Sequence, residues 1–199
     1  GFTHCSIEDV GSIRSIPNVD IISPSDCLET IKAVKASFEH KNSIYIRLTG
    51  TSNTGIVNKI DYEFEIGKSI QLENYGNDFA IISCGSLVKN CLDALENLNK
   101  KNIKGSLINM HTIKPIDKKK ILEISKNFKN IFIFDEHNIY GGLGSAVAEV
   151  LSSIKTDATL HINGINDEYI KGGSYKYLLD KYNLSVEKIE QEIQNKIIK

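Results

Sequence analysis

Residues 135–148 have the sequence Asp-Glu-His-Asn-Ile-Tyr-Gly-Gly-Leu-Gly-Ser-Ala-Val-Ala and carry more information about the fold than any other stretch of the chain. The apolar, aromatic-rich residues 130–134 just before them predict a buried strand, and the apolar spacing over 145–154 predicts a helix. Glycine permits the sharp turn between the two. In α/β proteins an elbow of this kind is where ligands or partner surfaces lie.

The glycine run does not by itself identify a ligand. Gly-Gly-Leu-Gly-Ser lacks the third glycine of the dinucleotide fingerprint, and no P-loop lysine follows it. A purely structural turn is therefore the alternative interpretation. The argument for a functional site depends on two further stretches, residues 109–117 (Asn-Met-His-Thr-Ile-Lys-Pro-Ile-Asp) and residues 1–9 (Gly-Phe-Thr-His-Cys-Ser-Ile-Glu-Asp).

The composition limits the class of protein. The chain has 199 residues, is 41% hydrophobic and has a net charge of −1 without a basic stripe, so we expect a folded core and no nucleic-acid partner. No apolar run approaches about 18 residues and no signal peptide opens the sequence, so we expect no membrane partner and a cytoplasmic protein. Cys84 and Cys91 are expected to be buried reduced thiols. Because the first residue is Gly and the single methionine is Met110, we expect a piece of a longer protein.

Strand and helix patterns alternate along the chain. We expect strands over 19–23, 43–48, 79–84, 106–110, 131–134 and 158–163, and helices over 6–15, 25–40, 87–100, 117–128, 145–154, 174–182 and 185–198. Ser25 is the expected N-cap of the second helix. Repeated strand–helix units predict an α/β fold with a mostly parallel sheet and helices on both faces.

The chain is expected to contain two unequal parts. Residues 1–50 hold too few strands to close a domain of their own, because sheet faces and edges would stay exposed. Residues 51–64 are rich in turn-forming residues and predict a linker. Residues 65–199 hold most of the strand–helix units and predict the larger domain.

These stretches, in this order, resemble the transketolase family, in particular the second subunit of split, two-chain transketolases. Residues 1–9 are similar to the Thr-His signature of the family's pyrimidine-binding domain, and residues 44–48 to the last strand of that domain. Residues 66–68, 109–117 and 135–148 are similar to the C-terminal domain. The resemblance covers essentially the whole chain and implies the last part of the pyrimidine-binding domain followed by a complete C-terminal domain.

The resemblance implies a fragment of a thiamine-diphosphate-dependent transketolase, inactive alone, from an enzyme that transfers a two-carbon ketol unit from a ketose to an aldose, either of them as phosphates. Contacts to thiamine diphosphate and Mg²⁺ are expected mainly outside this chain, because the family's catalytic glutamate would precede Gly1 and the diphosphate site would lie on a partner subunit. A dimer or a hetero-oligomer is implied. The alternatives are a 2-oxo-acid dehydrogenase beta subunit, a deoxyxylulose-phosphate synthase-like enzyme and a non-catalytic dimerisation or scaffolding module.

His4 and Arg47 are the candidate site residues. An imidazole can donate to a substrate hydroxyl or stabilise an oxyanion near neutral pH, and the resemblance implies that His4 is catalytic and contacts the ketose hydroxyls. Arg47 ends a predicted strand and could bind a phosphate with its planar fork or form a salt bridge. The resemblance suggests a sugar-phosphate anchor.

The other polar residues are given structural roles. Glu136 and His137 are adjacent in a strand, so their side chains should point in opposite directions, and we expect structural or subunit contacts. His111 and Lys114 are interpreted in the same way. His40 and His161 are too scattered for a metal site. We therefore expect neither a metal ligand nor a cofactor-binding residue within this chain.

Overall fold

The main sheet contains five strands. The computed structural model describes residues 6–49, 55–58 and 61–197. The strands lie in the order β3-β5-β4-β7-β8, and all neighbours are parallel except the antiparallel edge pair of β3 and β5. Their bounds are β3 Ile70–Asn74, β4 Phe79–Ser83, β5 Gly105–Asn109, β7 Asn130–Asn138 and β8 Thr159–Ile165. The predicted α/β class with a mostly parallel sheet is confirmed.

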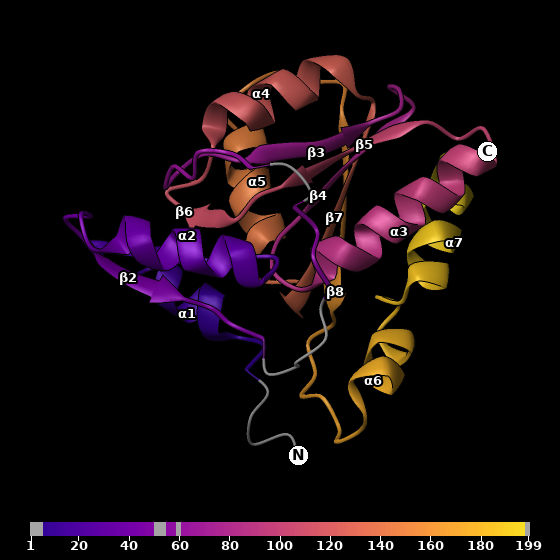
Figure 1. Ribbon diagram of the computed structural model, residues 1–199. Helices are drawn as coiled ribbons and strands as arrows, with labels where there is room; N and C mark the ends of the chain where they lie inside the picture. The colour runs from indigo at the N-terminus through magenta and orange to yellow at the C-terminus, as the bar shows by residue number, and fades with distance from the viewer. Residues whose placement is uncertain (1–5, 50–54, 59–60, 198–199) are drawn as a thin grey trace.

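Helices cover both faces of this sheet (Figure 1). One face is covered by α3 (Leu87–Lys100), α6 (Tyr175–Lys181) and α7 (Val186–Ile197), and the other by α4 (Lys118–Asn127) and α5 (Leu143–Leu151). Side chains alternate along each strand, so Phe132 faces the α3 side while Ile133 faces the α5 side. Strands buried on both faces have the nearly unbroken apolar sequences that the chain shows at β4 and β7.

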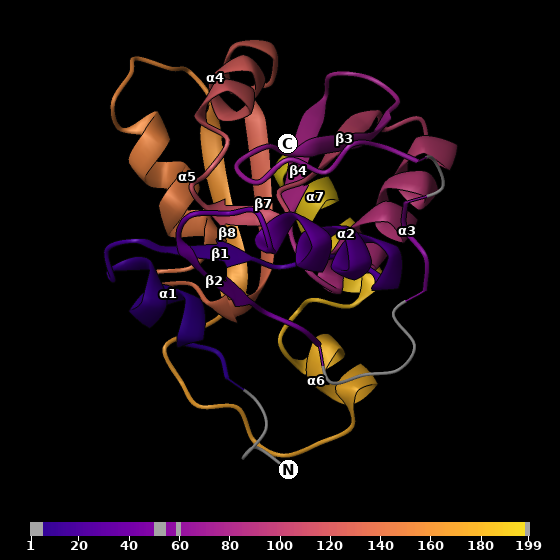
Figure 2. The same ribbon diagram turned by 60° about the vertical axis from the view of Figure 1, so that its left-hand side comes forward.

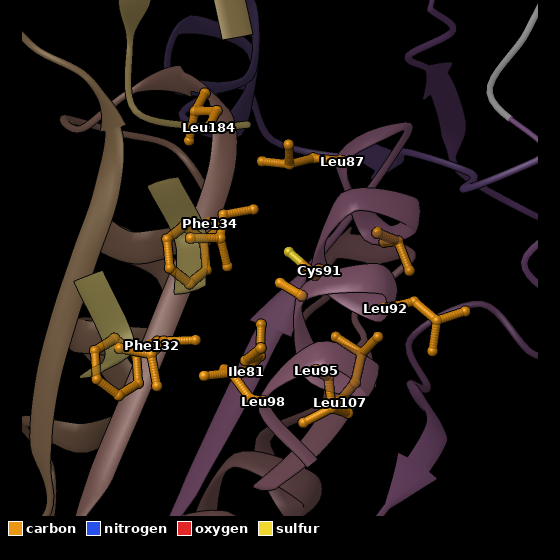
Figure 3. Packing of buried hydrophobic residues seen from close by; sticks show 14 of the residues in the cluster. Ile81, Leu87, Cys91, Leu92, Leu95, Leu98, Leu107, Phe132, Phe134 and Leu184 are labelled. Atoms are coloured by element: carbon orange, nitrogen blue, oxygen red, sulfur yellow. The ribbon is translucent and has the colours of Figure 1, made fainter. Parts of the chain in front are cut away.

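The core on the α3 side is built from aromatic strand residues and leucines of the helix. Figure 3 shows Phe132 and Phe134 of β7 facing α3 across Ile81 of β4. The α3 residues that meet them are fully or almost fully buried: Leu87, Cys91, Leu92, Leu95 and Leu98. This one-sided leucine pattern explains why α3 has the bounds that the sequence predicts.

The helix α2 (Cys27–Ser37) differs slightly from the prediction. Its N-cap is Asp26 and not Ser25, because the Asp26 carboxylate accepts the backbone N–H of Glu29 at 2.8 Å. The helix ends at Ser37, three residues before the predicted end. The first helix, α1 (Asp9–Arg14), is likewise shorter than the predicted range.

A second sheet joins the N-terminal segment to the larger part of the chain. Its order is β2-β1-β6, with β1 (Val19–Ile22) parallel to β2 (Ser43–Ile46) and antiparallel to β6 (Thr112–Lys114). Figure 2, in which the left-hand side of Figure 1 comes forward, shows α1, β1, β2 and α2 grouped in front of the larger sheet. The strand β6 was not predicted from the sequence. Within the described ranges, no helix has both the length and the apolar content that crossing a membrane requires.

Candidate functional site

The elbow at residues 135–148 begins inside a strand. β7 continues four residues past Phe134, so Asp135 and His137 both lie on it. Asp135 accepts the backbone N–H of Leu143 at 3.0 Å and so caps α5, whose N-cap residue Gly142 has no side chain to do this. Nδ1 of the buried His137 lies 2.7 Å from the Asn138 carbonyl oxygen. His137 thus serves as a fixed structural group of the elbow.

The elbow packs against α1 of the same chain. The backbone N–H of Gly11 donates to Nε2 of His137 at 3.2 Å, and Nη1 of Arg14 donates to the Gly141 carbonyl at 2.8 Å. Gly141 has a φ of +78°, and a Cβ placed on it would lie 2.8 Å from the Gly11 Cα. The glycines thus allow two backbones to touch, and the elbow forms a partner surface for the N-terminal segment.

This contact predicts the effect of a methyl group at Gly141. We expect Gly141→Ala to lower the free energy of unfolding by about 2–3 kcal/mol, because an L-residue is strained at positive φ and the new Cβ meets the Gly11 backbone. Urea denaturation of the chain measures this loss. Gly172→Ala is the matched control, because a Cβ there meets nothing within 4 Å, and it should change stability by less than about 1 kcal/mol. Equal effects of the two substitutions would contradict this packing.

A cavity of about 610 Å³ lies between the N-terminal segment and the carboxyl ends of β4, β7 and β8. In open α/β sheets this edge is where ligands bind. The polar residues that line the cavity come from both parts of the chain and include Ser6, Tyr45, Arg47, Ser86, Glu136 and Tyr175. Of the two predicted site residues, Arg47 lies in this cavity, and His4 lies outside the described residues.

Arg47 is held by three oxygen acceptors. Nε donates to Oδ2 of Asp9 at 2.8 Å, and Nη2 donates to the carbonyl oxygens of Ser6 at 2.9 Å and Glu136 at 3.0 Å. The Tyr45 hydroxyl donates to the same Asp9 oxygen at 2.9 Å. Both side chains of the ion pair are mostly buried, with 16% of Arg47 and 9% of Asp9 exposed. The salt bridge considered from the sequence is therefore present, at the wall of a cavity.

The pair is charged at neutral pH. Burial would raise the pKa of Asp9, but the Arg47 charge and its hydrogen bond hold that pKa below its ordinary value. Burial would lower the pKa of Arg47, but the carboxylates of Asp135 and Asp9 raise it. A permanent cation therefore lies at the cavity wall, which suits an anionic ligand.

Glu136 lines the same cavity from the opposite side of the strand to His137. Its carboxylate accepts from the Ser86 hydroxyl at 2.8 Å and from the Tyr175 hydroxyl. Burial raises the pKa of Glu136, an effect that these two hydrogen bonds oppose. Glu136 thus contacts α6 and the start of α3, whereas His137 contacts α1, so the predicted opposite directions of the two side chains are confirmed.

The remaining polar residues singled out from the sequence are not brought together. His111 is buried and stacks on Phe64 at 4.2 Å between ring centroids. Lys114 donates to the carbonyls of residues 14 and 16. His40 pairs with Asp20, and His161 with Asn130. These contacts stabilise the fold.

The polar cavity residues that the sequence did not single out include Asp9, Tyr45, Ser86 and Tyr175. No local pattern marks them, because their partners are 36 to 89 residues away in the chain. The one available signal was the acidic pair that follows Ser6-Ile7 in the N-terminal stretch. Cys84 and Cys91 are buried as expected, and burial raises the pKa of both thiols.

The described residues do not fit a magnesium–diphosphate site. Among them, no group of three or more His, Cys, Asp or Glu side chains could hold a metal ion. A magnesium diphosphate needs carboxylate or carbonyl oxygens that are available to the metal. Glu136 accepts with both carboxylate oxygens, from Ser86 and Tyr175, and Asp9 accepts from Arg47 and Tyr45 with Oδ2. Among the described residues this leaves Oδ1 of Asp9 as the one unpartnered carboxylate oxygen of the cavity, too few for a magnesium site.

The fold and the cavity define an α/β protein whose polar site lies where an N-terminal segment meets the strand ends of a larger domain. The chain belongs to the transketolase family: the model for the transketolase C-terminal domain matches residues 67–189.

Individual relatives agree with this assignment. The chain is 31% identical over 189 residues to one subunit of the apulose-4-phosphate transketolase of Phocaeicola vulgatus, covering 95% of this chain and 60% of that protein. It is 30% identical over 197 residues to the 1-deoxy-D-xylulose-5-phosphate synthase of Pelotomaculum thermopropionicum, covering 97% of this chain and 30% of that protein. A split-gene transketolase solved as an inactive beta4 tetramer matches with a TM-score of 0.91 at 31% identity, covering 100% of this chain and 64% of the other. The chain thus spans less than two thirds of these relatives.

Proposed function

We propose that the chain is part of the second subunit of a split, thiamine-diphosphate-dependent transketolase. Residues 1–50 would complete its pyrimidine-binding domain, residues 51–64 would link the two domains, and residues 65–199 would form the C-terminal domain. The similarity to one subunit of a two-chain transketolase and to a split-gene transketolase supports this proposal. The observation that carries it is the buried cation of Arg47 in a cavity at the strand ends.

In the assembled enzyme a two-carbon ketol unit passes from a ketose to an aldose. Thiamine diphosphate, bound with Mg²⁺ mainly by a diphosphate-binding partner subunit, would supply the nucleophilic carbon. The Arg47 guanidinium binds the phosphate of a sugar phosphate, because its planar fork suits phosphate oxygens. His4 donates to a sugar hydroxyl. Both residues hold the substrate in a reactive orientation.

This proposal predicts different behaviour for the chain alone and for the complex. The chain alone should not bind thiamine diphosphate with useful affinity, whereas the full-length subunit mixed with its partner, thiamine diphosphate and Mg²⁺ should transfer a ketol unit between sugar phosphates. Titration calorimetry with cofactor and Mg²⁺ tests the first part, and a coupled ketol-transfer assay tests the second. Micromolar cofactor binding by the chain alone would contradict the assignment of the cofactor contacts to other parts of the enzyme.

One alternative reaction has a specific observation in its favour. The similarity to a 1-deoxy-D-xylulose-5-phosphate synthase extends over nearly the whole chain. Formation of 1-deoxy-D-xylulose 5-phosphate by the reconstituted complex, without ketol transfer between sugars, would favour that reaction. A complex that forms but has neither activity would favour a scaffolding module or a 2-oxo-acid dehydrogenase beta subunit.

A further inference from the structure

Asp9 has an unusual set of contacts for a buried carboxylate. Its Oδ2 accepts from Nε of Arg47 and from the Tyr45 hydroxyl, while its buried Oδ1 has no hydrogen-bond partner among the described residues. Nε2 of His137 accepts from the Gly11 N–H and lies 3.9 Å from Oδ1, which is too far for a hydrogen bond. The hydrogen bonds of Asp9 are therefore all made through one oxygen, toward Arg47 and Tyr45.

These contacts fix the direction of the guanidinium. Arginine has five N–H donors in one plane. The carboxylate on Nε and the two carbonyls on Nη2 account for three of them. Because the group is planar and rigid, these contacts set the orientation of Nη1, whose two N–H groups have no acceptor among the described residues and can donate to a ligand in the cavity. A phosphate bound there would depend on this orientation.

The carboxylate is itself held by the C-terminal part of the chain. Asp9 is the first residue of α1, and α1 is attached to the elbow through Gly11 to His137 and Arg14 to Gly141. The Glu136 carbonyl, one residue before His137, contacts Arg47 directly. The elbow thus acts on Arg47 along two routes, one through the backbone of β7 and one through α1 and Asp9.

We infer that Asp9 is a positioning residue that orients Arg47 toward the phosphate of the substrate, and that the glycine elbow of the C-terminal domain keeps Asp9 in place. This inference rests on the proposed function in naming a sugar phosphate, but the phosphate contact can be tested separately. It also gives the C-terminal domain a role in selecting phosphorylated sugars.

The first test uses inorganic phosphate and the chain itself. Asp9→Asn keeps the shape of the side chain and removes its charge. We expect the dissociation constant for phosphate, measured by titration calorimetry, to rise about 10-fold or more in this variant, because a misplaced cation binds poorly. Asp20→Asn is the matched control: Asp20 is also a buried acid of the N-terminal segment, but it pairs with His40 and does not line the cavity. Equal phosphate affinity of Asp9→Asn and wild type would overturn the inference.

The second test separates positioning from a general loss of structure. In the reconstituted full-length enzyme, Asp9→Asn should raise KM for a phosphorylated sugar about 10–100-fold, while kcat and the KM for the unphosphorylated sugar stay near wild type. A similar rise in KM for both sugars would show a merely structural role and overturn the inference. If the wild-type enzyme transfers no ketol unit, the proposed function fails, and the phosphate titration still decides whether Asp9 positions Arg47.

Discussion

Arg47→Ala should lower the free energy of unfolding of the chain by about 3–5 kcal/mol, well beyond what a surface substitution does. The reason is the Asp9 carboxylate, of which only 9% is exposed and whose Oδ1 lacks a partner within the described part of the chain. Removing the guanidinium leaves this charge buried beside Tyr45 as its remaining donor. The cost comes from the unpaired acid more than from the lost attraction.

Urea denaturation of the chain at neutral pH measures this effect. Lys89→Ala is the control, because Lys89 pairs with Asp93 on the partly exposed surface of α3 and should contribute only about 0.3–0.5 kcal/mol. The double variant Asp9→Asn/Arg47→Ala should recover part of the loss, since the buried charge is gone. A loss below about 1 kcal/mol in Arg47→Ala would mean that water reaches Asp9 freely.

The pH dependence follows from the same pair. Since the folded-state pKa of Asp9 lies below the ordinary value of 3.8, the stabilisation by the pair is complete above that value and is lost as the pH falls through the folded-state pKa. The difference in stability between wild type and Arg47→Ala should therefore shrink in acid. A difference that stays constant down to low pH would show that Asp9 is not the cause.

Because Arg47→Ala is expected to destabilise the fold, a kinetic test of the phosphate contact needs a second variant of Arg47. Alanine removes both the proposed phosphate contact and the ion-pair partner of Asp9, so a rise in KM would combine two causes. Arg47→Lys keeps a cation near Asp9 but loses the planar fork. A fold as stable as wild type together with a raised KM for phosphorylated sugars only would identify the fork as the phosphate anchor.

Local patterns in the sequence predict the parts of the fold that depend on local physics. The leucine spacing of α3 fits only a helix with one buried face. The apolar runs of β4 and β7 fit only strands that are covered on both faces. The strand β6 has only three residues and pairs with β1 about ninety residues earlier in the chain. Nothing in its own sequence indicates that partner, so it was missed.

The candidate site likewise contains residues that the local sequence indicates and residues that only the folded chain brings together. Arg47 could be selected because it lies at the end of the predicted strand 43–48, in a stretch that resembles a known family. In the structure β2 is shorter and Arg47 directly follows its last residue, Ile46. Asp9, Ser86 and Tyr175 act through contacts that only the assembled fold creates. The elbow at residues 135–148 was identified from its glycines. Its packing against α1 could not be predicted, because it depends on Gly11, which lies 126 residues before its partner His137.

His4→Ala should lower kcat/KM of the reconstituted full-length enzyme by about 10–1000-fold, the range typical of one hydrogen-bond donor in a closed site. His4 is selected by its resemblance to the Thr-His signature of the transketolase family, and it lies outside the described residues. It is two residues before Ser6, whose carbonyl accepts from Arg47 and whose side chain lines the cavity.

The loss should fall on the chemical step. A donor to a substrate hydroxyl that strengthens in the transition state affects kcat, whereas the proposed phosphate contact of Arg47 should affect mainly KM. Steady-state kinetics with paired phosphorylated and unphosphorylated sugars separate the two, and His4→Ala should reduce turnover of both. His40→Ala is the control, because His40 pairs with Asp20 and does not line the cavity. Wild-type kinetics for His4→Ala would remove His4 from the active site and leave Arg47 as the one substrate contact that we assign to this chain.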